Sequence, residues 1–181
     1  MNIEIISGSP RENSVTVRVA KFLNNELSKK FDKHSVDLLD IRDFPLPMVQ
    51  EVWGSIDKVP EEWKPLAKRM FGADAFILVT PEYNGSYSPA MKNLLDHFSK
   101  QSRKPFGIVT ASPGAMGGMR ASQQLQQMVC AFAGIPCPQM LIIPGVDKKF
   151  DASGVLTDES FQNSIDSFVE EYKWLAEKLT N

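Results

Sequence analysis

Short apolar runs alternate with longer amphipathic stretches along the whole chain, and this alternation limits the fold more than any other feature. Residues 75–80 form a continuous apolar run, and residues 2–7 are rich in isoleucine. Such runs are typical of strands that are covered on both faces. Between the runs, apolar residues recur at the three- and four-residue steps of a helix face. The sequence therefore predicts an α/β protein.

The predicted elements form five β-α units, which fit one domain of residues 1–181. We expect strands at residues 2–7, 35–41, 75–80, 106–110 and 140–143. We expect helices over residues 15–27, from 60–65 to 71, 88–98, 125–132 and 165–179. Right-handed crossovers favour a flavodoxin-like three-layer α/β/α sandwich, with a five-stranded parallel sheet in the order 2-1-3-4-5. Ligands of such sheets bind at the carboxyl ends of the strands, near the switch point between strands 1 and 3.

The charge and cysteine content exclude several classes of partner. The 20 basic and 22 acidic residues leave a formal net charge of -2, which is too weak to attract nucleic acid or an anionic membrane. No apolar run approaches the roughly 20 residues that span a bilayer, and Glu4 argues against a signal peptide. Cys130 and Cys137 have neither zinc-site nor C-x-x-C spacing. We expect a cytoplasmic protein without a metal site.

The loop after the first strand, residues 7–16, reads Ser-Gly-Ser-Pro-Arg-Glu-Asn-Ser-Val-Thr and leads into a helix. A helix N-terminus offers unpaired N–H groups and a positive dipole end, which suit a phosphate. The loop lacks both the P-loop lysine and the G-x-G-x-x-G fingerprint. A single terminal phosphate therefore fits better than a triphosphate or a dinucleotide. The alternative is a polar turn in which Ser14 merely caps the helix.

Two further loops follow the third and fourth strands. Residues 80–89 read Thr-Pro-Glu-Tyr-Asn-Gly-Ser-Tyr-Ser-Pro and supply a wall for a flat aromatic ring, or only a turn in which Ser88 caps the next helix. Residues 111–118 carry three glycines, which let a backbone approach a ligand closely. All three loops are expected at one edge of the sheet.

Together these loops resemble the NADPH-dependent FMN reductase family, a branch of the flavodoxin-like superfamily that includes quinone, chromate and azo-dye reductases. The resemblance extends from the first strand to at least residue 146. It rests on Gly-Ser-Pro-Arg-Glu-Asn-Ser at residues 8–14, Thr-Pro-Glu-Tyr-Asn at 80–84 with Lys92-Asn93, and Ser-Pro-Gly at 112–114 with Gly117-Gly118.

The resemblance implies how FMN is held. The first loop would bind the phosphate, the second would line the isoalloxazine ring largely through its backbone, and the third would flank the other side of the ring. Thr16 departs from an asparagine found in some relatives but keeps a hydrogen-bonding side chain. Arg120 follows the third loop and is a possible contact for an NAD(P)H phosphate. The implied FMN-binding residues are Ser9, Arg11, Ser14, Val15, Thr16, Pro81, Glu82, Tyr83, Asn84, Gly85, Ala111, Ser112 and Gly114.

The resemblance also implies an activity. Hydride would pass from NAD(P)H to bound FMN and then to a quinone, flavin, azo or metal-oxyanion acceptor in ping-pong order, with no catalytic side chain because the flavin supplies the chemistry. Relatives form homodimers or homotetramers, so a homo-oligomer is expected. Two alternatives remain: a flavodoxin-type electron carrier, which the balanced charge disfavours, and a non-redox FMN-binding module. Glu82 is either a proton donor or a subunit contact, and His97 is expected to be structural.

Overall fold

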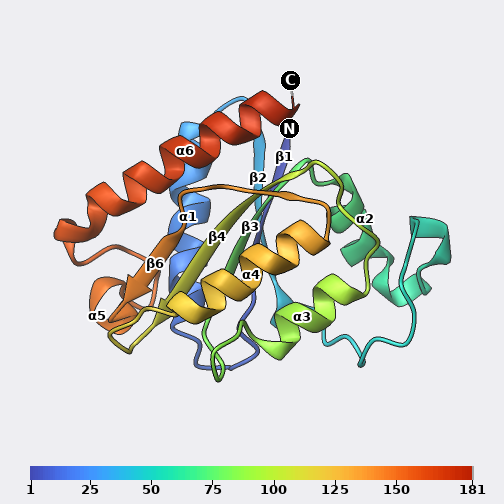
Figure 1. The fold of residues 1–181 in the computed structure, drawn as a ribbon, viewed down its shortest axis with the longest axis horizontal. Helices are drawn as coiled ribbons and strands as arrows, with labels where there is room; N and C mark the ends of the chain where they lie inside the picture. The colour runs from blue at the N-terminus through green and yellow to red at the C-terminus, as the bar shows by residue number, and fades with distance from the viewer. Residues whose placement is uncertain (181) are drawn as a thin grey trace.

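The computed structural model describes residues 1–180 and has a central parallel sheet with helices on both faces (Figure 1). The strands are β1 (Asn2–Ser7), β2 (Ser35–Asp40), β3 (Ala75–Thr80), β4 (Pro105–Ser112), β5 (Ile135–Pro136) and β6 (Leu141–Pro144). The helices are α1 (Thr16–Lys30), α2 (Lys64–Gly72), α3 (Pro89–Asp96), α4 (Met119–Ala131), α5 (Val146–Lys149) and α6 (Gln162–Thr180). Short 3₁₀ turns lie at Ile41–Asp43, Ile56–Lys58, Glu61–Trp63 and Glu159–Phe161.

The strand order is β2-β1-β3-β4-β5, which confirms the predicted flavodoxin-like arrangement. The last place in this order is shared by two short strands. β5 pairs with the first residues of β4, whereas β6, the predicted strand at 140–143, pairs with its last residues. The sequence pattern did not predict β5, because a two-residue strand that contains Pro136 has no recognisable alternation.

Two apolar cores lie on opposite faces of the sheet, as the alternation of side chains along β1 illustrates. Ile3 and Ile5 belong to the core beneath α1 and α6, whereas Ile6 belongs to the core beneath α2, α3 and α4. Glu4 is the charged exception in this strand, and Arg69 of α2 donates to both of its carboxylate oxygens at 3.0 and 2.7 Å. Burial raises the pKa of Glu4 despite this partner. This partly buried pair links α2 to β1.

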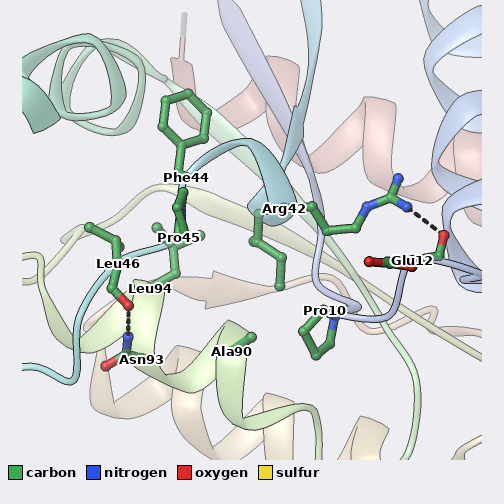
Figure 2. Close-up of a pocket in the computed structure, with 10 residues that line it drawn as sticks. Pro10, Glu12, Arg42, Phe44, Pro45, Leu46, Ala90, Asn93 and Leu94 are labelled. Carbon is green, nitrogen blue, oxygen red and sulfur yellow. Dashed lines mark hydrogen bonds between the residues drawn. The ribbon is translucent and has the colours of Figure 1, made fainter.

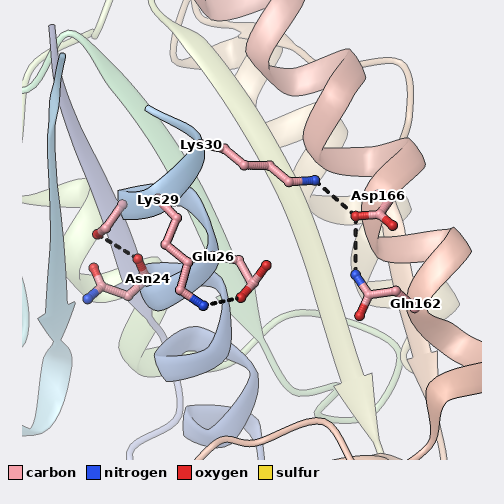
Figure 3. Close-up of polar contacts among 7 residues, drawn as sticks. Asn24, Glu26, Lys29, Lys30, Gln162 and Asp166 are labelled. Atoms are coloured by element: carbon pink, nitrogen blue, oxygen red, sulfur yellow. Dashed lines mark hydrogen bonds and ion pairs between the residues drawn. The ribbon is translucent and has the colours of Figure 1, made fainter. Parts of the chain in front are cut away.

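Polar contacts connect α1 with α6 on the other face, where both helices cover the sheet (Figure 3). The Lys30 ammonium lies 2.9 Å from Asp166, and Gln162 donates to the same carboxylate at 3.1 Å. The hydrogen bond from Lys30 holds the pKa of Asp166 below its usual value. Because these groups are partly exposed, the packing of the core contributes more to holding α6 in place.

No helix within residues 1–180 is both long and apolar enough to cross a membrane. The same span contains no cluster of histidine, cysteine, aspartate or glutamate suited to a metal ion.

Candidate functional site

The three predicted loops meet at the carboxyl edge of the sheet around a cavity of about 270 Å³, which we call the polar cavity. Strands β1, β3 and β4 are neighbours in the sheet, so their following loops are brought side by side. Asn13 and Pro113 also line the polar cavity, although they were not among the predicted binding residues. The predicted residues that line it are Ser9, Arg11, Ser14, Val15, Thr16, Pro81, Glu82, Tyr83, Ala111 and Ser112.

The first loop is anchored at Gly8. Its N–H donates to the Val79 carbonyl at 2.8 Å, and its carbonyl accepts from the Ser88 hydroxyl at the start of α3. A Cβ atom at Gly8 would lie 2.3 Å from Cε of Met91 and 3.2 Å from the Val79 carbonyl oxygen. Glycine therefore allows the loop to run close against β3 and α3. Ser88 also caps α3 by accepting from the Met91 N–H, as predicted.

Unused hydrogen-bond donors converge at the start of α1. Within residues 1–180, the backbone N–H groups from Arg11 to Thr16 and the hydroxyls of Ser9 and Thr16 donate to no other residue. Ser9 and Thr16 are nevertheless almost completely buried and line the cavity. The Ser14 oxygen accepts from the Val17 N–H at 3.2 Å, which leaves its hydroxyl proton for another acceptor. The capping role and a phosphate-binding role of Ser14 are therefore compatible.

This set of donors fits the phosphate of a bound FMN. Hydroxyls and backbone N–H groups are neutral donors, and the positive end of the α1 dipole favours an anion at the same place. Arg11 adds a formal charge, and its guanidinium carbon lies 4.9 Å from the centre of the Tyr83 ring. This cation–π contact joins the first loop to the second across the cavity. Arg11 thus supplies both the positive charge of the first loop and its contact with the aromatic ring of Tyr83.

The second loop closes with a tight turn at Asn84 and Gly85. Both residues have positive φ, at 51° and 87°, and Tyr83 and Ser86 exchange backbone hydrogen bonds of 2.8 and 3.1 Å. Asn-Gly is a strong signal for such a turn. Asn84 lines a neighbouring hollow with Tyr87, and neither Asn84 nor Gly85 lines the polar cavity. Their assignment to FMN therefore stays a prediction.

Two of the three glycines of the third loop, Gly117 and Gly118, pack against the sheet, whereas all three were expected to let the backbone approach a ligand. A Cβ atom on Gly117 would lie 2.7 Å from the backbone nitrogen of Pro144, and one on Gly118 would lie 2.9 Å from Cβ of Thr110. Both residues have positive φ. Gly114 differs, since its N–H donates to the Ser112 hydroxyl at 3.0 Å and it does not line the polar cavity.

Glu82 and Arg120 contact each other between the second loop and α4. The Glu82 carboxylate accepts from the Arg120 backbone N–H at 3.2 Å and lies 3.5 Å from its guanidinium. The Glu82 side chain is 18% exposed, whereas that of Arg120 is 65% exposed. Glu82 therefore caps the N-terminus of α4, and Arg120 retains donors that face solvent.

His97 lies in the core, where its Nδ1–H donates to the Asn93 carbonyl at 2.7 Å.

A second cavity of about 340 Å³ lies on the other side of the first loop, and we call it the apolar cavity (Figure 2). Pro10 and Glu12 line this cavity, whereas Ser9, Arg11 and Asn13 line the polar one. Successive residues of the loop thus face different cavities. The other residues that line the apolar cavity are Ile41, Arg42, Phe44, Pro45, Leu46, Ala90, Asn93 and Leu94.

Two hydrogen-bonded side chains fix the walls of the apolar cavity. Arg42 donates to the Glu12 carbonyl at 3.0 Å and, through Nε, to Asp40 at 2.9 Å. Asn93 of α3 donates to the Pro47 carbonyl at 2.9 Å (its contact with Leu46 is drawn in Figure 2). The sequence pattern predicted an irregular proline-rich segment here but gave no sign of a cavity.

Comparison with known proteins identifies close relatives of this chain. A family model described as NADPH-dependent FMN reductase matches residues 1–147. A quinone reductase of Pseudomonas putida is 31% identical over 179 residues, which cover 94% of this chain and 92% of the relative. An FMN-dependent NADPH-azoreductase of Staphylococcus aureus is 32% identical over 178 residues, with 92% and 90% coverage.

Solved structures agree with these sequence matches. The flavoenzyme FerB of Paracoccus denitrificans, an NAD(P)H:(acceptor) oxidoreductase, superposes with a TM-score of 0.81 at 26% identity, covering 98% of both chains. A flavodoxin mutant from Pseudomonas aeruginosa reaches a TM-score of 0.58 at 18% identity, with 96% of this chain and 99% of that chain covered. The flavodoxin likeness concerns the fold alone.

Proposed function

Because the chain belongs to the NADPH-dependent FMN reductase family, we propose that it passes hydride from NAD(P)H, through FMN held at the polar cavity, to a small-molecule electron acceptor. The chain is an oxidoreductase that uses FMN, with NAD(P)H as co-substrate. The observation that carries the site assignment is the convergence of unused hydroxyl and N–H donors at the start of α1, beside Arg11.

The residues of the chain bind and orient the cofactor, and FMN supplies the hydride chemistry when bound. Ser9, Ser14 and Thr16 would donate hydrogen bonds to the phosphate, with the backbone of the same loop. Pro81 to Tyr83 would line one side of the ring, and Ala111 and Ser112 the other. The ring would keep one face open, which suits exchange of NAD(P)H for a second substrate and hence ping-pong kinetics.

We propose quinones and azo compounds as the first acceptors to test. Relatives that are 31% and 32% identical carry the names quinone reductase and azoreductase, and both matches cover almost the whole chain. Free flavins and metal oxyanions such as chromate are further acceptors in this proposal. An electron carrier is the second candidate, favoured only by the likeness in fold to flavodoxin.

A spectrum followed by anaerobic titration tests the proposal directly. The purified protein, or protein reconstituted with FMN, should absorb in the visible region and bleach when NADPH or NADH is added. Re-oxidation by a quinone should restore the colour. Failure to retain FMN after reconstitution would refute the proposed site. Bound FMN that NAD(P)H reduces only through a separate reductase would favour the carrier instead.

We propose a homodimer or homotetramer whose copies meet at the groove between α3 and α4. This groove has a volume of about 610 Å³ and is lined mainly by apolar side chains, among them Leu95, Phe98 and Met128. Val52 at its rim is 60% exposed. Light scattering should report a mass of at least two chains, and Met128→Glu should lower this mass.

We also propose a cytoplasmic location, where NAD(P)H is available. Cell fractionation tests this proposal.

A further inference from the structure

Another cavity, of about 170 Å³, lies between the segment that connects β2 to α2 and the end of α3. Its walls are unusual in composition, because they combine aromatic rings with carboxylates and contain no lysine or arginine. We call it the aromatic cavity. The residues that line it are Pro47, Met48, Gln50, Glu51, Trp53, Pro60, Glu62, Trp63 and His97.

The inner wall of the aromatic cavity is rigidly built. Trp53 is 4% exposed and His97 is 3% exposed, and their ring centres lie 4.7 Å apart. The Trp53 N–H donates to the His97 carbonyl at 2.7 Å, and the Trp53 carbonyl accepts from the Ser99 N–H at 3.0 Å. These backbone bonds attach the connecting segment to the end of α3. The cavity is therefore a formed feature of the fold.

The hydrogen bond of His97 determines which of its ring nitrogens is a donor and which is an acceptor. The Asn93 carbonyl can only accept, so the Nδ1 atom that lies 2.7 Å from it must carry the proton. In the neutral ring, Nε2 is then an acceptor, and it has no hydrogen-bond partner within residues 1–180. His97 lines the cavity, so a ligand there that carries an N–H donor would satisfy this free acceptor.

The carboxylates determine the charge of that ligand. Glu51 and Glu62 are exposed, line the cavity and form no ion pair with any residue in the described part of the chain. The neighbouring Glu61 differs, since it pairs with Lys64 and does not line the cavity. Two carboxylates and two indole rings together attract a cation, and indole is the best aromatic partner for one.

A metal ion does not fit these walls, because no suitable cluster of ligating side chains occurs within residues 1–180. The volume is also well below the roughly 300–1,000 Å³ of sites for drug-sized ligands. We infer that the aromatic cavity binds a small alkylammonium compound, whose N–H group donates to His97 Nε2 and whose charge faces the carboxylates and indoles. This site does not depend on the proposed flavin chemistry.

Titration of the FMN-loaded full-length protein with n-butylammonium chloride tests this inference. Tryptophan indole N–H signals in a two-dimensional NMR spectrum provide the readout, because Trp53 and Trp63 line the cavity while Trp174 is 55% exposed on α6. We expect saturable shifts at Trp53 and Trp63 and none at Trp174. Binding should be weaker for 1-butanol, which lacks the charge, and for tetramethylammonium, which lacks the N–H donor.

Variants that remove carboxylates inside and outside the cavity can be compared by their affinity for butylammonium. The double variant Glu51→Gln with Glu62→Gln should weaken butylammonium binding by about fivefold to tenfold, as loss of the charge attraction predicts. Glu61→Gln should leave the affinity unchanged, since Glu61 lies outside the cavity. Equal binding of butanol, equal shifts at Trp174, or equal losses from Glu61→Gln and the double variant would each overturn the inference. Absence of saturable shifts at Trp53 and Trp63 would do the same.

Discussion

The two cavities that share the first loop differ in the chemical character of the residues that line them. The polar cavity is lined by hydroxyls, Arg11 and the start of α1, whereas the apolar cavity is lined mainly by aliphatic and aromatic groups from α3 and residues 41–46. One short stretch of backbone separates them and contributes alternate side chains to each. At this edge of the sheet, a phosphate suits the cavity on one side of the first loop, and an apolar group suits the cavity on the other side.

The largest effect on FMN affinity is expected from substitutions that change the polar cavity alone. Replacing Arg11 and Ser14 together with alanine should weaken FMN binding by about 100-fold or more, because two hydrogen bonds to a charged group are lost at roughly 1.5–3 kcal/mol each. Fluorescence titration of the apoprotein with FMN measures this. Glu12→Gln is the control, since that side chain lines the apolar cavity and should change the affinity less than about threefold. Unchanged affinity in the double variant would disprove the phosphate assignment.

A second prediction concerns the glycines of the third loop, next to the residues that line the polar cavity. Gly117→Ala should lower the free energy of unfolding by about 2–3 kcal/mol, because the new Cβ meets the backbone of β6 and the positive φ disfavours alanine. Denaturant unfolding monitored by circular dichroism measures the change. Gly114→Ala should stay within about 0.5 kcal/mol, because its new Cβ would lie at an ordinary contact distance of 3.4 Å from the Ser112 hydroxyl oxygen. Similar losses in both variants would mean that the glycines do not differ in packing.

A third prediction asks whether the two sides are coupled. Arg42 lines the apolar cavity but donates to the Glu12 carbonyl, so it restrains the backbone of the loop that also lines the polar cavity. Arg42→Ala should weaken FMN binding by about threefold to tenfold, equivalent to one hydrogen bond of roughly 1 kcal/mol. The same fluorescence titration applies. An effect as large as that of the Arg11 and Ser14 double variant would show that the two sides are not separable.

The smallest effect is expected from filling the apolar cavity. Ala90→Leu adds apolar volume beside Leu94 and should raise the melting temperature slightly, while the affinity for FMN changes less than about twofold. Calorimetry and FMN titration measure the two quantities. Loss of FMN binding in a well-folded Ala90→Leu protein would indicate that the cofactor extends into the apolar cavity.

The sheet and the polar cavity could be predicted because each depends on local signals. Apolar runs located the main strands, and the rule for parallel sheets brought the loops after β1, β3 and β4 together. The apolar and aromatic cavities could not be predicted, since irregular segments form much of their walls and no periodicity connects these segments with α3. Gly117 was misread for a related reason: its neighbour in space is β6, and only the folded chain shows that contact.

The alternation along the first loop also limits how its length can change. Ser9, Arg11 and Asn13 face one cavity, and Pro10 and Glu12 face the other. Inserting a residue after Pro10 would move Arg11 and Asn13 away from the positions at which they line the polar cavity. Insertions or deletions between Ser9 and Asn13 should therefore weaken FMN binding.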